Sequence, residues 1–285
     1  MKTTHTVIKL AYPIILLALI AAGGGIFWQG SGDAYAFTTL RGETVQVYGR
    51  GLYRYDTLSY AAQAIGQDSA TLLVGIPLLI IGVVLARRGS LRGQMLLAGG
   101  LGYMLYTYTS YAFLSAYNAF FLIYVALFSL SLFAFILAMS GMDVDRISRA
   151  AGRMPRRGIA IFLTLLAAFL GVAWLGRIVP PLLAGAPPFG LEAYTTLVIQ
   201  ALDLGIIVPA SAITAVLLWR KRPWGYGLAC VLMVKGLMMG AALIAMIIGQ
   251  ILAGLSVSPF EIVMFSGIAL AALVFTVITF RNIEQ

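Results

Sequence analysis

A single lysine lies within a long apolar stretch near the C-terminus, and it is the residue best placed to do chemistry. Lys235 is the charge in LMVKGLMMG, residues 232–240, and an isolated charge in a bilayer costs several kcal/mol. Asp203, in the preceding apolar run, is the natural partner. At ~1.5 Å per residue, Asp203 lies ~25 Å above Arg220 and Lys235 lies ~20 Å above Arg222. A lysine side chain can span that difference in height, so we expect an Asp203–Lys235 pair.

Other polar side chains are expected at the same depth, on the side away from the basic loops. Thr196, Gln200 and Asp203 follow an i, i+4, i+7 spacing, which places them on one stripe of a helix. Tyrosine and threonine residues form a second stripe in the run at 94–115. We therefore predict an outward-facing polar cavity lined by the second, third, sixth and seventh spans. Its candidate residues are Asp203, Lys235, Gln200, Thr196, Tyr103, Tyr106, Thr107, Tyr111, Asp68, Arg177 and Glu261.

Each of these residues also has a structural interpretation. The Asp203–Lys235 pair could fix helix packing instead of handling a ligand, an ion or a proton. The tyrosines could form an interfacial aromatic belt. Asp68, Arg177 and Glu261 could be ordinary charges at the membrane boundary.

The composition places the chain among polytopic membrane proteins. Of its 285 residues, 61% are hydrophobic and 10% are charged, whereas soluble domains have roughly 45–50% apolar and about 25% charged residues. The net charge of +9 does not indicate nucleic-acid binding, because the basic residues lie in short loops and form no stripe. One cysteine excludes a disulfide within the chain, and one histidine argues against a histidine-based metal site or a haem. No cofactor, metal site or catalytic residue is predicted.

Eight apolar runs are long enough to span a bilayer at ~20 residues each. They are approximately 7–29, 67–87, 94–115, 118–140, 158–180, 193–219, 224–252 and 260–280. With the N-terminus inside, only Arg41, Arg50 and Arg54 of the 19 basic residues fall in outer loops, and Arg177 and Lys235 fall within spans. Because basic residues favour the cytoplasmic side, we predict an all-α integral membrane protein with eight transmembrane helices. Both termini are expected to be cytoplasmic, in a plasma membrane of the bacterial inner-membrane type.

The first run also has features of a secretory signal. Lys2 and Lys9 precede an apolar segment, and Ala34-Tyr35-Ala36 resembles a signal-peptidase site. The segment is long for a signal peptide, and the candidate site lies well beyond its end, so we expect a retained first span. Cleavage of residues 1–36 would leave seven helices, with the N-terminus outside.

Two loops are long enough to have a structure of their own. In the outer loop, about 30–66, the alternation in ETVQVYGRGLYRYD and its Gly-Arg-Gly break suggest a small hairpin. We expect it to pack as a lid on the helix ends, because a hairpin alone is marginally stable. From Thr57 onward the sequence is typical of a helix that extends the second span. The loop at 141–157 is expected to face the cytoplasm and to contact membrane lipids or a partner.

The single transmembrane domain, 1–285, has two faintly similar halves, 1–140 and 158–285. AGGGIFWQG (22–30) and AFLGVAWLG (168–176) share Ala, Gly, Trp and Gly at the same offsets. ARRGSLRG (86–93) and LWRKRPWG (218–225) both turn at the expected cytoplasmic face. The pattern suggests a 4+4 parallel repeat of the type found in some transporters, although short apolar words also recur by chance.

Four classes of function remain open. A small-molecule transporter or permease fits the spans, the repeat and the titratable pair, and it is our first interpretation. A receptor, sensor or binding protein for an external small ligand is the alternative. An intramembrane enzyme is less favoured, because no known catalytic motif is present. Lys235 with a nearby carboxylate resembles the Schiff-base site of microbial rhodopsins, but tyrosines occupy the third span, where we find no counterion motif. The expected partners are membrane lipids and an unknown small molecule or proton, with no nucleic acid.

Overall fold

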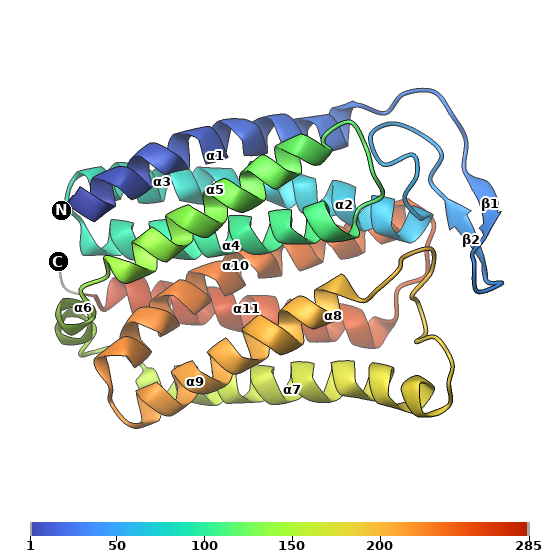
Figure 1. The fold of residues 1–285 in the computed structure, drawn as a ribbon. Helices are drawn as coiled ribbons and strands as arrows, with labels where there is room; N and C mark the ends of the chain where they lie inside the picture. The colour runs from blue at the N-terminus through green and yellow to red at the C-terminus, as the bar shows by residue number, and fades with distance from the viewer. Residues whose placement is uncertain (1, 284–285) are drawn as a thin grey trace.

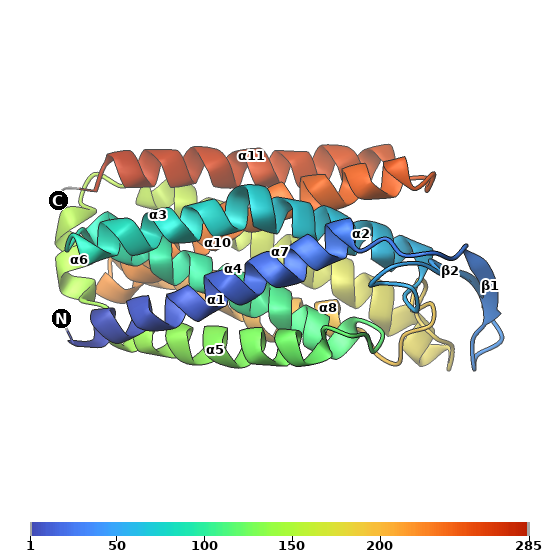
Figure 2. The ribbon, with the colours of Figure 1, turned by 90° about the horizontal axis from the view of Figure 1, so that it is seen from above.

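The computed structural model describes residues 2–283, and long helices form most of it (Figure 1). They lie side by side along one direction, so that α1 begins and α11 ends at the same end of the bundle, here called the termini end. A β-hairpin lies at the other end, here called the hairpin end (Figures 1 and 2). The helices are α1 (Lys2–Phe27), α2 (Leu58–Ala70), α3 (Ile76–Arg87), α4 (Leu91–Leu114), α5 (Phe121–Ser140), α6 (Val144–Ala150), α7 (Arg156–Leu183), α8 (Val198–Leu202), α9 (Val208–Trp219), α10 (Pro223–Leu252) and α11 (Pro259–Arg281).

These helices have the length and composition of a multi-pass membrane protein. Within residues 2–283, seven are long and apolar enough to cross a membrane, when continuous segments such as Leu58–Arg87 are counted as one. The prediction of an all-helical membrane protein is therefore supported. The remaining long helix, α4, has 24 residues. Its tyrosine and threonine side chains lower its apolar character, and most of them are buried against neighbouring helices.

Two of the long segments are interrupted by a π-helical turn of five residues. Thr71–Gly75 joins α2 to α3, and Asp203–Ile207 joins α8 to α9. In each case a proline, Pro77 or Pro209, is near the start of the following helix. Proline has no N–H group to donate within a helix, and π-helical turns are frequent at functional sites. The two turns mark where the main-chain hydrogen-bond pattern changes.

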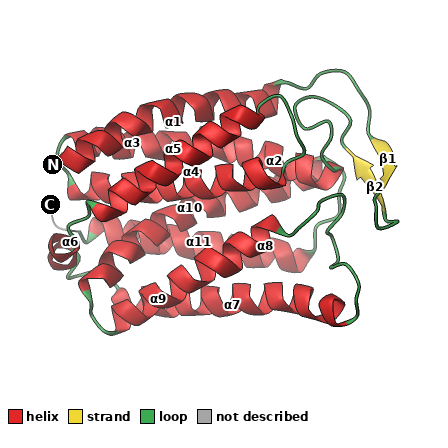
Figure 3. Cartoon of the chain, viewed as in Figure 1, coloured by secondary structure: helices red, strands yellow, loops and turns green. Residues whose placement is uncertain are grey.

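The paired strands of the hairpin lie earlier in the sequence than predicted (Figure 3). Strand β1 (Tyr35–Thr38) pairs antiparallel with β2 (Thr44–Val47), so its turn lies before the predicted segment and not at Gly-Arg-Gly. Gly49 and Gly51 instead adopt φ values of 79° and 64°, which favour glycine. They fold the chain back in a second turn, where the Tyr48 N–H donates to the Asp56 carbonyl oxygen at 2.9 Å. The predicted helix after Thr57 is confirmed: α2 begins at Leu58, and the Thr57 side chain accepts from the Tyr60 N–H.

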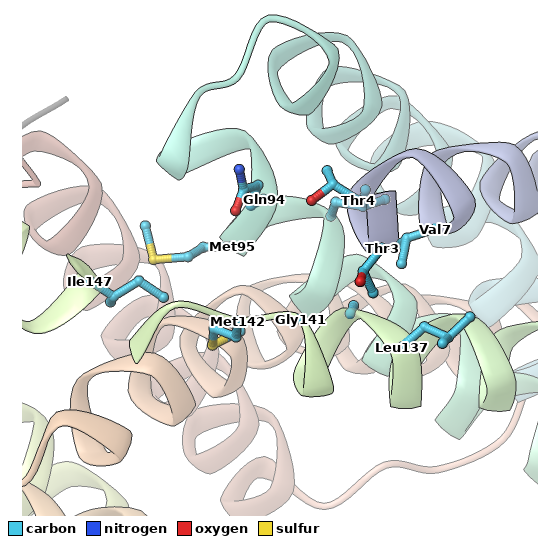
Figure 4. Close-up of a pocket in the computed structure, with 11 residues that line it drawn as sticks. Thr3, Thr4, Val7, Gln94, Met95, Leu137, Gly141, Met142 and Ile147 are labelled. Carbon is cyan, nitrogen blue, oxygen red and sulfur yellow. The ribbon is translucent and has the colours of Figure 1, made fainter. Parts of the chain in front are cut away.

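The termini end of the bundle is closed by apolar packing. The predicted loop at 141–157 contains a short helix, α6, which its sequence did not indicate and whose Ile147 side chain is buried. Ile147 packs with Leu91, Met95, Ile159 and other apolar side chains. A crevice of about 30 Å³ remains beside them, next to Thr3 and Gln94 (Figure 4). It has room for one or two water molecules, so it is too small for a larger ligand.

Candidate functional site

A cavity of about 500 Å³ extends from the hairpin end into the middle of the bundle. This volume is within the range of roughly 300–1,000 Å³ typical of ligand pockets. The predicted walls are present: α2, α4, the α8–α9 segment and α10 all contribute lining residues. Two further helices, α7 and α11, also line the cavity, together with the loop that contains Glu192 and Tyr194. Apolar side chains make up most of the lining, and each of these elements also contributes polar ones.

Lys235, Tyr106 and Asp203 form one connected group on the cavity wall. The Lys235 ammonium lies 4.1 Å from the centroid of the Tyr106 ring, a geometry in which cation and ring attract each other. The Tyr106 hydroxyl donates to Asp203 Oδ1 at 2.7 Å. Trp174 Nε1 donates to Asp203 Oδ2 at 2.9 Å. We expected a simple ion pair. The structure instead places Tyr106 between the lysine and the aspartate, in contact with both.

In this arrangement the lysine and the aspartate differ in their hydrogen-bond partners. Both oxygens of Asp203 accept a hydrogen bond from a neutral aromatic side chain. The Lys235 ammonium has three N–H donors, and its contact among the described residues is with the face of the Tyr106 ring. An ammonium in a mostly apolar cavity favours a hydrogen-bond acceptor. An oxygen-bearing or anionic group placed at Lys235 could accept hydrogen bonds from this ammonium.

Most of the predicted site residues line this one cavity. They are Asp203, Lys235, Gln200, Thr196, Tyr106, Thr107, Tyr111, Arg177 and Glu261. Two details differ from the prediction. Thr196 lies in the loop before α8, so the expected helical stripe on this segment begins at Gln200. Glu261 also closes a capping box with Ser258 at the start of α11, which gives it a structural role.

Asp68 and Tyr103 were expected in the cavity, but they are outside it. Asp68 is buried behind the wall and accepts hydrogen bonds from Tyr53 at 2.6 Å and from Tyr111 at 3.0 Å. Tyr103 is also buried, and its hydroxyl accepts from Gln67 Nε2 at 2.7 Å. The reason is rotation about the helix axis, because residue height alone does not say which side of a helix a residue occupies.

Several cavity residues were not identified as site residues from the sequence. Trp174 is the most important, because it donates to Asp203. It precedes Arg177 by three residues, and both line the cavity, so the i, i+3 spacing on α7 was an available signal. Glu192 and Tyr194 are in an irregular loop, where no periodicity could place them.

A polar network joins the two outermost loops above the cavity. Arg41 donates to the carbonyl oxygens of Glu192 and Tyr194, at 2.9 and 2.7 Å. The Thr57 hydroxyl donates to the Glu192 carboxylate, and the Tyr194 hydroxyl donates to Asp56 Oδ1 at 3.1 Å. These bonds connect the first outer loop to the loop that precedes α8. The predicted packing of the first outer loop on the helix ends thus has specific contacts.

Asp56 makes this network sensitive to pH. It is 1% exposed, and its Oδ2 atom has no hydrogen-bond partner. Burial raises the pKa of Asp56 from 3.8 to about 7, against the opposing effects of the Ala116 N–H and the Tyr194 hydroxyl. The folded state therefore holds a proton that the unfolded state releases between about pH 4 and 7. Stability is highest at low pH and falls as the pH rises through this interval.

We expect thermal unfolding in detergent to show this dependence, with a melting temperature that decreases from pH 5 to pH 8. Asp56→Asn should flatten the decrease, because an amide does not ionise and still offers an acceptor to Ala116. Burial also raises the pKa of the Glu192 carboxyl, so a smaller slope of the same sign should remain in the variant. Parallel curves for the two proteins would contradict the assignment to Asp56.

Comparison of the chain with models of protein families, with curated proteins and with solved structures finds no match. Within residues 2–283, no group of three or more His, Cys, Asp or Glu side chains could hold a metal ion. The arrangement around Lys235 is therefore the observation from which a function can be argued.

Proposed function

We propose that the chain is a membrane protein that binds a small molecule from outside, in the cavity at Lys235. The proposal takes the eight long helical segments as eight crossings, with the termini end in the cytoplasm. The distribution of basic residues supports that orientation, because outer loops carry few of them. The cavity then opens beneath the first outer loop, and Arg41 links that loop to the rim.

The observation that carries the proposal is the Lys235 ammonium, for which the described residues provide the face of a ring but no hydrogen-bond acceptor, within a largely apolar cavity. Asp203 attracts this cation through space, but both of its oxygens already accept hydrogen bonds from Tyr106 and Trp174. A carboxylate, phosphate or carbonyl oxygen of a ligand would complete the site. Charge-assisted hydrogen bonds of this kind are about twice as strong as neutral ones.

Binding is favoured over transport by the inner end of the cavity. The deepest lining residues include Phe162, Leu163, Leu232 and Ala272, and the packed cluster around Ile147 lies between them and the termini end. Transport needs a polar route to the cytoplasm in some conformation. In the conformation described here, apolar packing occupies that route, which suits a binding or sensing protein.

Transport is the second candidate, and the likeness of the two π-helical turns supports it. The helices that follow them, α3 and α9, both have 12 residues. The next helices, α4 and α10, each place a glycine against the preceding helix, α3 and α9 respectively. A Cβ atom on Gly93 would lie 2.3 Å from Ala86 N, and one on Gly225 would lie 2.7 Å from Leu218 N. This correspondence supports a duplication of 1–140 and 158–285, and repeats of this kind can rock against each other.

Native mass spectrometry of the protein released directly from membranes tests the binding function. We expect a discrete additional mass on the unaltered protein and its loss from Lys235→Met, because methionine fills similar space without a charge. Lys235→Arg should retain part of the adduct, since it keeps a cation in the cavity. Removing a charged partner typically costs 2–5 kcal/mol of binding, which corresponds to about 30-fold or more.

The thermal unfolding of each variant is the control for this experiment. Equal adduct on the unaltered protein and on a folded Lys235→Met variant would contradict a ligand site at Lys235. A bare unaltered protein that also fails to bind any of a panel of added carboxylates and phosphates would contradict binding altogether.

A further inference from the structure

Two helices that line the cavity, α7 and α11, pack mainly against other helices. Helix α7 packs along α9, and α11 packs along α10. Near the termini end, the rings of Phe162 and Phe275 meet with centroids 5.5 Å apart. Above that point both helices line the cavity, and within the described residues they are not packed against each other along their length. We infer that the seam between them is the side from which the cavity is reached from the hydrocarbon.

Each of these two helices presents an apolar stripe to the cavity. On α7 the stripe is Phe162, Leu166 and Leu170, at i, i+4 and i+8, and it continues to Trp174. On α11 the corresponding face includes Phe265, Ile268 and Ala272. Arg177 and Glu261 also line the cavity from these two helices, nearer the hairpin end, and the other polar lining residues are on α2, α4, the α8–α9 segment, α10 and the loop before α8. One cavity therefore has an apolar compartment beside the lipid and a cationic anchor at its back.

The apolar stripe runs past the level of Lys235 toward both ends of the bundle. Measured along the helices from their starts at Arg156 and Pro223, Phe162 is ~9 Å, Lys235 is ~18 Å and Trp174 is ~27 Å from the termini end. In a hydrocarbon core about 30 Å thick, Lys235 is therefore close to the middle of the span. A molecule with a charged head and a hydrocarbon tail fits this cavity with its head at Lys235 and its tail along the stripe.

We propose that the ligand is a single-chain anionic amphiphile, which enters from the bilayer between α7 and α11. Its headgroup binds the Lys235 ammonium, and its tail lies against the apolar stripes of the two helices. This inference rests on the proposed binding function and adds the chemical class of the ligand. A soluble polar ligand would leave the apolar compartment filled with water, whereas a hydrocarbon tail fills it without cost to polar groups.

Trp174 provides a direct probe, because it lines the cavity between the two compartments. The experiment uses the full chain with Trp28, Trp219 and Trp224 replaced by Phe, reconstituted in vesicles, and measures quenching by 9,10-dibromostearate. We expect saturable quenching of Trp174. The half-saturating concentration should rise at least 10-fold for the methyl ester of the same acid, which keeps the tail but has no charge. It should rise similarly in Lys235→Met.

Two controls separate the amphiphile from simpler binding. A variant that retains only Trp28, which is 49% exposed and directly follows α1, should show non-saturable quenching from probe dissolved in the bilayer. The short acid 2,3-dibromopropanoate, which has a charge but no tail, should not quench Trp174 at the same concentrations.

Each contrary result has a distinct meaning. Saturable, Lys235-dependent quenching by the short acid, as strong as that by dibromostearate, would overturn the amphiphile and leave the binding function standing. Equal quenching by acid and ester, unchanged in Lys235→Met, would overturn both the headgroup contact and the proposed function. Quenching of Trp174 that never saturates would overturn the amphiphile site, because it reports partitioning into the bilayer.

Discussion

Gly25→Ala should severely destabilise the fold, whereas Gly23→Ala on the same helix should be tolerated. A Cβ atom on Gly25 would lie 1.8 Å from Asp68 Oδ2 and 2.7 Å from the Tyr53 hydroxyl. The side chain of Asp68 cannot move away without losing its hydrogen bonds to Tyr53 and Tyr111. Overpacking together with a disrupted buried carboxylate should cost roughly 3 kcal/mol or more.

Gly23 is a closely matched control for this prediction. A Cβ atom there meets nothing within 4 Å, and both substitutions gain the same preference of alanine for a helix. The measurement is the melting temperature of the purified protein in detergent, together with the fraction that elutes as folded protein. Equal melting temperatures for the two variants would show that α1 and Asp68 are not in the close contact described here.

The membrane class and most helices were predictable because they depend on apolar composition over many residues. The predicted span at 224–252 and α10 (Pro223–Leu252) nearly coincide. This helix approaches α11 closely, since a Cβ on Gly240 would lie 2.8 Å from the Ala269 side chain. The similar depths of Lys235 and Asp203 were also predictable, because depth in a helix follows from counting residues.

Rotation and loop structure could not be predicted in the same way. Counting residues gave Asp68 and Asp203 similar depths. Asp203 faces the cavity, whereas Asp68 is on a side of its helix that faces away from it. Asp68 faces Tyr53, a residue of the outer loop whose position no periodicity could give. The chain does reverse at Gly49 and Gly51, where Val47 and Thr57 form an antiparallel bridge, but the paired strands flank an earlier turn that contains Gly42.

The aromatic groups around Asp203 illustrate a further limit. A carboxylate in an apolar run predicts some partner, and the sequence offered Lys235 as the one opposite charge nearby. Neutral donors serve as well in a buried site, and the structure uses Tyr106 and Trp174. Tyrosine and tryptophan are so common in membrane helices that neither could be assigned to Asp203 in advance.

The cavity should be reachable by water-soluble reagents from outside and closed from the cytoplasm, which is the second large effect we expect. Cys230 is the one cysteine of the chain and is buried, so Cys230→Ala gives a background free of thiols. On α10, Met239 lines the cavity, whereas Ile244 is 38% exposed and does not line it. We place Ile244 on the lipid side, where a reagent that requires water cannot react.

The most direct measurement is labelling of Met239→Cys and Ile244→Cys by a membrane-impermeant maleimide, in right-side-out and in inverted vesicles. We predict that Met239→Cys reacts in right-side-out vesicles alone, and that Ile244→Cys reacts in neither, although it is nearer the outer surface. Reaction of Met239→Cys from the cytoplasmic side, or from neither side, would contradict an outward-facing cavity.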